Sequence, residues 1–270
     1  MVTARLHWSD LPQTVRDEIE ERTGPIQHVQ TVSGGYNSSI AVRLDTGSGT
    51  IFLKGLSSTH PRVWTQSREA AVAPYTRDLA PPLLWHMQSG GWDLLAFRFL
   101  DGGHHADYSA GSPDLPLLAD TLTSLAQIPA PPIELKDASS RWASYLPDPE
   151  IRSMLGGTHL AHTDFNPENV IITDGNAVLV DWGWASTAAP WVDSALCCIW
   201  LVSTGRQSPA AAEQWAARMP AWRTAPPAAL DAFAQANARL WASIADQNPG
   251  LWSTALREAA RRYAEHRNGV

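Results

Sequence analysis

Short stretches of alternating hydrophobic and polar residues fill the first third of the chain and end at turn-forming residues. They lie at 29–32, 40–44, 50–54, 83–85 and 94–100. β-Branched and aromatic residues in such stretches, bounded by Gly, Asn, Asp and Ser, are typical of β-strands joined by turns. The pattern therefore predicts five strands in this part of the chain.

Helices are expected on either side of the first three strands. Residues 10–23 place Leu11, Val15 and Ile19 at helical spacing, and Gly24 follows directly. Asp10 is the predicted N-cap of this helix, because a short acidic side chain accepts a hydrogen bond from the first turn. A second helix-like segment follows the third strand. It contains Glu69.

From about residue 113 onward, the hydrophobic pattern has the period of a helix. Leucines form one helical stripe within 113–128, an apolar helix is expected at 193–201, and residues 209–267 are rich in alanine. This last stretch is interrupted at Pro220, Pro226, Pro227 and 248–250. Prolines end or begin helices, so the chain is expected to be α+β, with a sheet first and helices afterwards.

The segment from His162 to Gly183 has the most distinctive polar pattern. It reads His162-Thr163-Asp164-Phe165-Asn166-Pro167-Glu168-Asn169, an apolar run, Asp174-Gly175-Asn176, a second apolar run and Asp181-Trp182-Gly183. Two short apolar runs around a turn that favours positive φ predict a β-hairpin. The hairpin is expected to bring Asp164, Asn169 and Asp181 together.

These three side chains suit phosphoryl transfer. The reaction needs a carboxylate that orients and deprotonates a hydroxyl group, and oxygen ligands that hold Mg²⁺ on the phosphates. Asp164 is the predicted catalytic carboxylate, and Asn169 and Asp181 are the predicted metal ligands. The structural alternative makes His162 a loop histidine and Asp181 a strand-end cap.

The ordered motif resembles the aminoglycoside phosphotransferase family, the small-molecule relatives of protein kinases. Protein kinases carry Arg in the second position of the first motif and Phe in the later triplet. Thr163 and Trp182 stand there in this chain and fit small-molecule kinases better. The resemblance implies a bilobal, protein-kinase-like α+β fold. Residues 1–100 would form a nucleotide-binding lobe with a five-stranded antiparallel sheet and a helix, and residues 101–270 a mainly helical lobe with the catalytic loop and substrate cleft.

The resemblance also implies a nucleotide site in the first lobe. Lys54 is one of only two lysines in the chain and ends the third strand. It would bind the nucleotide phosphates as a compact charge, held by Glu69; a surface lysine is the alternative. The other residues of the predicted site are Gly34, Gly35 and Ser38 in a phosphate-facing turn, and the main chain of Arg98 and Leu100 in the hinge. A plain hairpin turn explains the two glycines equally well.

Two residues of the second lobe are expected to support the site. His162 would hold the catalytic loop in place rather than take part in the chemistry. Asp193 begins the apolar segment 193–201 and is therefore a predicted helix N-cap. The resemblance adds a second role, in which Asp193 braces the main chain near His162.

Composition narrows the class of protein. Hydrophobic residues make up 44% and charged residues 17% of the 270 residues, as in ordinary globular proteins. The N-terminus lacks the apolar core of a signal peptide, and no apolar run approaches the ~20 residues of a membrane span. The adjacent Cys197 and Cys198 are expected to be reduced. We therefore expect a cytoplasmic protein with no membrane partner.

The net charge of −7 is concentrated in the second part of the chain, where residues 104–270 hold seventeen acids and eleven bases. An acidic surface argues against nucleic acid as a partner. It suits a cationic substrate, for which Asp231 is one candidate contact, or a merely solvated surface.

The expected function is that of a Mg²⁺- and ATP-dependent kinase that phosphorylates a hydroxyl group of an antibiotic, such as an aminoglycoside, or of a related metabolite. GTP use, a role in antibiotic resistance and a monomeric or homodimeric state are left open. The chain ends without the acidic, aromatic segment common in aminoglycoside-modifying members, which weakens a 3′-hydroxyl assignment. The alternatives are a protein kinase, disfavoured by the missing Ala-Pro-Glu signature, a non-catalytic pseudokinase, and a metallohydrolase built on His162 and Asp164.

Overall fold

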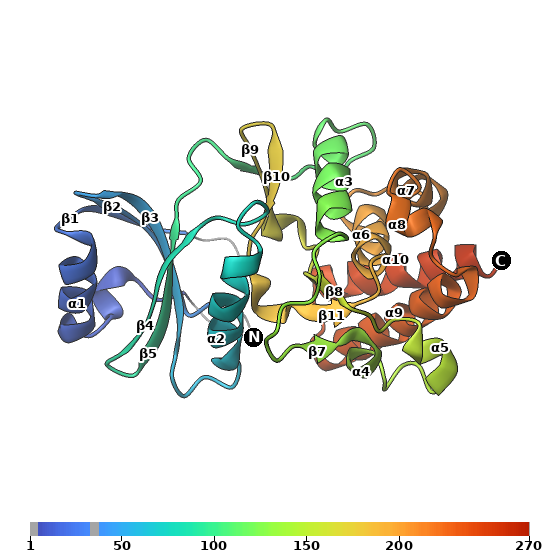
Figure 1. Ribbon diagram of the computed structural model, residues 1–270, viewed down its shortest axis with the longest axis horizontal. Coiled ribbons are helices and arrows are strands. Elements are labelled where there is room, and N and C mark those ends of the chain that lie inside the picture. The colour runs from blue at the N-terminus through green and yellow to red at the C-terminus, as the bar shows by residue number, and fades with distance from the viewer. Residues whose placement is uncertain (1–4, 33–37, 270) are drawn as a thin grey trace. The chain divides into compact units, whose positions relative to one another are not determined.

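A computed structural model describes residues 5–32 and 38–269 (Figure 1). The chain divides into two compact units. The first comprises residues 1–103 and 179–183, and the second comprises residues 104–178 and 184–270. The chain therefore leaves the second unit after Val178 and returns to it at Trp184.

The first unit is built on a five-stranded sheet with the order β1-β2-β3-β5-β4. Its strands are β1 (Ile26–Thr31), β2 (Ile40–Thr46), β3 (Gly49–Ser57), β4 (Leu83–Ser89) and β5 (Trp92–Arg98). Every neighbouring pair is antiparallel, so the predicted sheet is confirmed. The period of two places Leu53 in the buried core and Lys54 on the opposite face.

Helix α1 (Gln13–Thr23) buries Val15 and Ile19 against the core residues of the sheet. The predicted N-cap is wrong. The α-helix begins after Pro12, and Asp10 instead closes a preceding 3-10 turn, where its carboxylate accepts the N–H of His7 at 2.7 Å. Proline has no N–H to donate and is pre-set for a helix start, so the helix begins after it. Helix α2 (Trp64–Val72) carries Glu69.

The second unit is mainly helical. Its helices are α3 (Asp114–Leu125), α4 (Ala138–Arg141), α5 (Pro149–Ser153), α6 (Val192–Ser203), α7 (Pro209–Ala216), α8 (Pro220–Arg223), α9 (Pro227–Gln247) and α10 (Leu251–Arg267). The predicted helix breaks are confirmed, because Pro220 and Pro227 each begin a helix. Residues 192–202 of α6 are all buried, so this helix forms the centre of the unit.

Two small sheets complete the described secondary structure. Their strands are β6 (His104–His105), β7 (Lys136–Asp137), β8 (His159–Ala161), β9 (Val170–Thr173), β10 (Asn176–Leu179) and β11 (Ser186–Ala188), in the orders β10-β9-β6 and β7-β11-β8. Single 3-10 turns lie at η1 (Trp8–Asp10), η2 (Ala73–Tyr75), η3 (Pro167–Asn169) and η4 (Trp182–Trp184).

The predicted hairpin is present in these sheets as β9 and β10. Asp174 and Gly175 connect the two strands with φ angles of 50° and 72°, as a two-residue hairpin turn requires. Within residues 5–32 and 38–269, no helix has the length and apolar character needed to cross a bilayer.

Candidate active site

Lys54 is buried between two carboxylates of the first unit. Its Nζ lies 2.7 Å from Glu69 Oε2 and 3.0 Å from Asp181 Oδ1. The side chains of Lys54 and Glu69 are 6% and 4% exposed, whereas that of Asp181 is 20% exposed. Asp181, two residues beyond the end of β10, adopts a φ of 64°, which is uncommon for a non-glycine residue. One ion-pair group therefore joins strand β3, helix α2 and the segment that follows β10.

Electrostatics keep this lysine charged. Burial by itself would lower the pKa of Lys54, but the charges of Asp181 and Glu69 outweigh it and raise that pKa. Burial raises the pKa of Glu69, and the charge of Lys54 opposes the shift. Two carboxylates share one ammonium group, so the fully ionised group carries one net negative charge. Such a group attracts a further cation at its most exposed member, Asp181.

The loop between β8 and β9 in the second unit carries the predicted catalytic residues. Asn169 is buried and donates through Nδ2 to the Asp164 carbonyl at 3.3 Å. Asn166 caps the η3 turn by accepting the N–H of Glu168 at 3.2 Å. The loop is thus closed on itself, with the half-buried carboxyl group of Asp164 near its start.

His162 lies under this loop. Its ring is fully buried and packs against Phe165 with ring centroids 5.4 Å apart. The Asp164 N–H donates to His162 Nδ1 at 3.3 Å, so this ring nitrogen accepts a hydrogen bond from the main chain. These contacts are consistent with the predicted supporting role of His162.

Asp193 does not cap α6, and the predicted N-cap is wrong. Trp191 holds that position, and the Asp193 carboxylate accepts the N–H groups of His162 at 2.9 Å and Thr163 at 3.0 Å. These amides belong to the loop between β8 and β9. The carboxylate oxygens of Asp193 therefore bond the loop and not the N–H groups at the start of α6. Burial raises the pKa of Asp193 to about 6, against the opposing effect of the two amides and of Arg141.

The predicted site residues thus fall into two groups. Glu69 and Asp181 each contact Lys54 in the first unit, and His162, Asp164, Asn169 and Asp193 lie together in the second. That the hairpin brings Asp164, Asn169 and Asp181 together stays a prediction.

The remaining predicted nucleotide contacts lie along the first unit. Gly34 and Gly35 are outside the described residues, whereas Ser38 is half-buried just before β2. Arg98 ends β5, and its N–H donates to the Pro82 carbonyl at 2.9 Å. This hydrogen bond occupies the main-chain N–H of Arg98. Leu100 follows two residues later and is half-buried.

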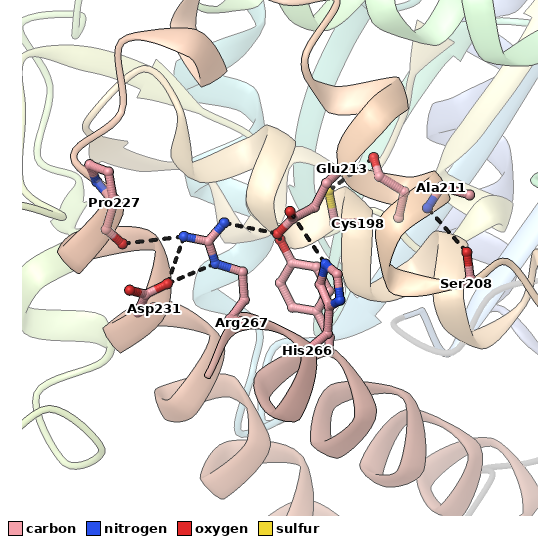
Figure 2. Close-up of polar contacts among 10 residues, drawn as sticks. Cys198, Ser208, Ala211, Glu213, Pro227, Asp231, His266 and Arg267 are labelled. Atoms are coloured by element: carbon pink, nitrogen blue, oxygen red, sulfur yellow. Dashed lines mark hydrogen bonds and ion pairs between the residues drawn. The ribbon is translucent and has the colours of Figure 1, made fainter. Parts of the chain in front are cut away.

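Asp231, one candidate contact for a cationic substrate, is paired through Oδ1 with Arg267. Figure 2 shows Arg267 between Asp231 and Glu213, with Nη2–Oδ1 and Nη1–Oε1 distances of 2.6 and 3.0 Å. His266 Nε2 lies 3.5 Å from the second oxygen of Glu213. This group fastens α10 to α7 and α9.

Arg141 contacts the catalytic loop but is not among the predicted residues. Its Nη2 donates to the Thr163 carbonyl at 3.2 Å and its Nη1 to the Trp184 carbonyl at 3.0 Å. Arg141 precedes Thr163 by 22 positions and follows no pattern of its own. The one available signal is the motif itself, in which threonine stands where protein kinases carry arginine.

Comparisons with known proteins agree with this fold. The model of the phosphotransferase enzyme family matches residues 148–228. The choline kinase LicA from Streptococcus pneumoniae is 12% identical, with a TM-score of 0.65 over 94% of this chain and 98% of that one. An aminoglycoside phosphotransferase from Alicyclobacillus acidocaldarius is 15% identical, with a TM-score of 0.63 over 100% of this chain and 96% of that one.

A thermostable mutant of aminoglycoside phosphotransferase APH(4)-Ia, in ternary complex with ADP and hygromycin B, is also 15% identical, with a TM-score of 0.60 over 93% and 99% of the two chains. The curated proteins include no significant sequence match. At these identities the structures establish the fold, and the predicted α+β, kinase-like fold class is confirmed.

Proposed function

We propose that this chain transfers the γ-phosphoryl group of ATP to a hydroxyl group of a small molecule. Its residues 148–228 match the phosphotransferase enzyme family, as the motifs predict. The observation that carries this proposal is the buried Lys54, held by Glu69 and Asp181. A lysine costs free energy to bury, and nucleotide phosphates supply a reason to keep it there.

The first lobe, 1–100, is proposed to bind the nucleotide. Lys54 contacts the phosphates, and Glu69 keeps the ammonium group in place from α2. The main-chain carbonyl of Arg98 and the N–H of Leu100 contact the adenine. The turn with Gly34, Gly35 and Ser38 covers the phosphates through main-chain amides. Solved structures with this fold contain ADP and AMP-PNP, which supports nucleotide binding; GTP is the alternative donor.

Asp181 and Asn169 are proposed to hold Mg²⁺. Both offer oxygen, the donor that Mg²⁺ prefers, and Asn169 Nδ2 already donates to the Asp164 carbonyl at 3.3 Å, which leaves its carboxamide oxygen for a cation. Within residues 5–32 and 38–269, no three His, Cys, Asp or Glu side chains form a metal-binding group. When bound, the cation neutralises charge on the phosphates.

Asp164 is proposed to act on the acceptor within the second lobe, 101–270. Its carboxylate accepts the hydrogen bond of the acceptor hydroxyl and orients the oxygen toward the phosphorus. It takes the proton as the new oxygen–phosphorus bond forms and the bond from the γ-phosphorus to the β-phosphate oxygen breaks, which releases ADP. Positioning accounts for most of the catalysis in phosphoryl transfer. The buried His162 and Asp193, which bond the loop main chain, keep Asp164 in place.

The acceptor is proposed to be a hydroxylated antibiotic, such as an aminoglycoside, or a related metabolite. A choline kinase and aminoglycoside phosphotransferases share the fold, which favours a small molecule over a protein. The excess of acids in residues 104–270 favours a cationic compound. Because the reaction consumes ATP, we place the protein in the cytoplasm.

A mass-spectrometric screen tests this function. The protein and MgATP are incubated with aminocyclitol, peptide and nucleoside antibiotics, sugars and amino alcohols, and a phosphoryl mass gain is sought. Asp164→Asn keeps the shape of the side chain and is expected to lower transfer by about 10²–10⁴-fold, with MgATP binding within twofold of the wild type. Asp120→Asn, at an exposed position of α3, is the matched control and should retain full activity.

The other outcomes separate the alternatives. MgATP binding without a mass gain on any compound would contradict the proposed transfer and favour a pseudokinase. Phosphorylation of a protein substrate alone would favour a protein kinase. Absence of nucleotide binding would contradict the proposed roles of Lys54 and Glu69.

A further inference from the structure

Thr163, directly before the proposed catalytic Asp164, has a strained main chain. Its φ is 61°, in the left-handed region that β-branched residues seldom adopt. A residue is held there only at a cost in free energy. The loop keeps this shape only if its surroundings hold it, and the shape decides where the next side chain points.

Two side chains of opposite charge hold the main chain of Thr163 from its two ends. Its N–H donates to Asp193 Oδ1 at 3.0 Å, and its carbonyl accepts from Arg141 Nη2 at 3.2 Å. Hydrogen bonds to charged groups are about twice as strong as neutral ones. Thr163 is only 4% exposed, so water competes little for these groups. Together they hold both peptide groups that flank the strained φ.

The Nη1 group of Arg141 extends this contact to the chain after the hairpin. Nη1 donates to the Trp184 carbonyl at 3.0 Å and to the Thr163 hydroxyl group. The Thr163 hydroxyl in turn donates to the Trp184 carbonyl at 2.7 Å. One guanidinium group thus joins residue 163 to residue 184, which a lysine with its single point of charge does not reproduce.

The guanidinium group is itself fixed by aromatic neighbours. Its Cζ lies 5.0 Å from the ring of Trp142 and 5.3 Å from the ring of Trp184, within the range of cation–π attraction. Trp142 is buried against Phe233 of α9, with ring centroids 5.1 Å apart, and its Nε1 donates to Asn237 at 3.4 Å. Through Trp142, the guanidinium group of Arg141 is therefore packed against the core that α9 contributes to.

We propose that Arg141 is a positioning residue of the catalytic loop, which locks Thr163 in its left-handed conformation and so directs the carboxylate of Asp164 toward the acceptor. Arg141 thereby contacts Thr163, the second residue of the His-x-Asp motif, although it lies outside the motif in the sequence. The inference rests on the proposed role of Asp164 in phosphoryl transfer. Arg141 acts through Thr163 and takes no part in the chemistry.

The test compares Arg141→Ala with the wild type on an acceptor found in the screen. Misplacement of a reacting group by about 1 Å costs up to about 10²-fold in rate, so kcat should fall about 10- to 100-fold. The acceptor KM and the Kd of MgATP should stay within twofold, because Arg141 is not proposed to touch either ligand. Guanidinium chloride at about 20 mM should restore part of kcat, and the same concentration of sodium or ethylammonium chloride should not.

Arg239→Ala is the matched control. Arg239 also donates to a main-chain carbonyl, that of Tyr145 at 3.0 Å, but it is exposed on α9 and outside the loop. Its kcat should equal that of the wild type. If Arg141→Ala does not fold, Arg141→Lys replaces it in the test. This variant keeps the positive charge but lacks the two Nη groups that donate to residues 163 and 184, so its kcat should fall about 3- to 10-fold.

Amide hydrogen exchange supplies a readout that needs no substrate. Peptides that cover residues 160–166 should exchange faster in Arg141→Ala than in the wild type, while peptides from α9 should not. If the wild type transfers no phosphoryl group, the proposed function fails and exchange alone still tests the positioning role. Unchanged exchange at 160–166 would overturn that role, as would a variant that raises KM and leaves kcat unchanged.

Discussion

Removal of the Lys54 charge tests the electrostatics of the first unit directly. Lys54→Met keeps an unbranched side chain of similar length and leaves the carboxylates of Glu69 and Asp181 beside each other. Both lie within 3.0 Å of the ammonium group that is lost. The variant therefore changes one charge with little change in packing, and its effect on stability reports on the ion pairs.

The size of the effect follows from burial. Breaking a buried ion pair from one side costs about 3–5 kcal/mol, because the remaining charge is left uncompensated. Asp181 is 20% exposed and keeps part of its hydration, whereas Glu69 is 4% exposed, so one carboxylate bears most of the cost. We expect the free energy of unfolding to fall by about 3 kcal/mol at pH 7.

The loss should depend on pH in a defined direction. Without Lys54, burial and the charge of Asp181 both raise the pKa of Glu69 above its ordinary value of 4.5, with no cation to oppose them. A carboxyl group with a raised folded pKa stabilises the protein below its unfolded pKa, and this contribution is lost as pH rises through the folded value. The deficit relative to the wild type should therefore grow from pH 5 to pH 8.

Urea unfolding followed by circular dichroism, with EDTA and without nucleotide, measures these differences. Lys136→Met, which changes the only other lysine of the chain at an exposed position, is the control and should stay within about 0.5 kcal/mol of the wild type. Lys54→Met/Glu69→Gln should recover about 2 kcal/mol, because it removes the uncompensated charge. A deficit below about 1 kcal/mol at every pH, with no recovery in the double variant, would refute the reasoning.

Three further changes test other parts of the fold. Gly55→Ala should destabilise the protein by about 1–3 kcal/mol in urea unfolding, because the added Cβ would lie 2.3 Å from Leu94 Cδ2; an unchanged midpoint would contradict the close approach of β3 and β5. Arg267→Ala should cost about 1–2 kcal/mol, less at high salt, because Glu213 loses a partly buried partner 3.0 Å away; thermal unfolding at two salt concentrations checks it. The pKa of Asp193 is about 6 when folded, above its unfolded value. Its contribution to stability is therefore lost as pH rises toward 6, so wild-type stability relative to Asp193→Asn should fall by roughly 1 kcal/mol from pH 5 to pH 7, and a rise would contradict the direction of the shift.

Features that depend on a few neighbouring residues were accessible from the sequence. The turn of the β9–β10 hairpin follows from Asp174 and Gly175, which tolerate positive φ. The starts of α8 and α9 follow from Pro220 and Pro227. The five strands follow from a period of two, because a half-buried strand repeats its environment at every second residue.

Local rules failed where a tertiary partner competed for the same group. Asp193 has the side chain of an N-cap, yet its oxygens accept the amides of His162 and Thr163. The free energy of bonding two buried amides exceeds that of capping one helix end. Local pattern around residue 193 does not distinguish these two uses, and only the family resemblance pointed to the second.

The sequence by itself determined the order of the strands and helices and the residue types suited to phosphoryl transfer. Beyond the expected pair of Lys54 and Glu69, only the tertiary structure decided which distant polar groups meet. Lys54 and Asp181 are 127 positions apart, and Arg141 and Thr163 are 22 apart, with no periodic pattern that links either pair. The physical reason is that periodicity records burial on one element, whereas ion pairs form between elements that the packing of the whole unit brings together.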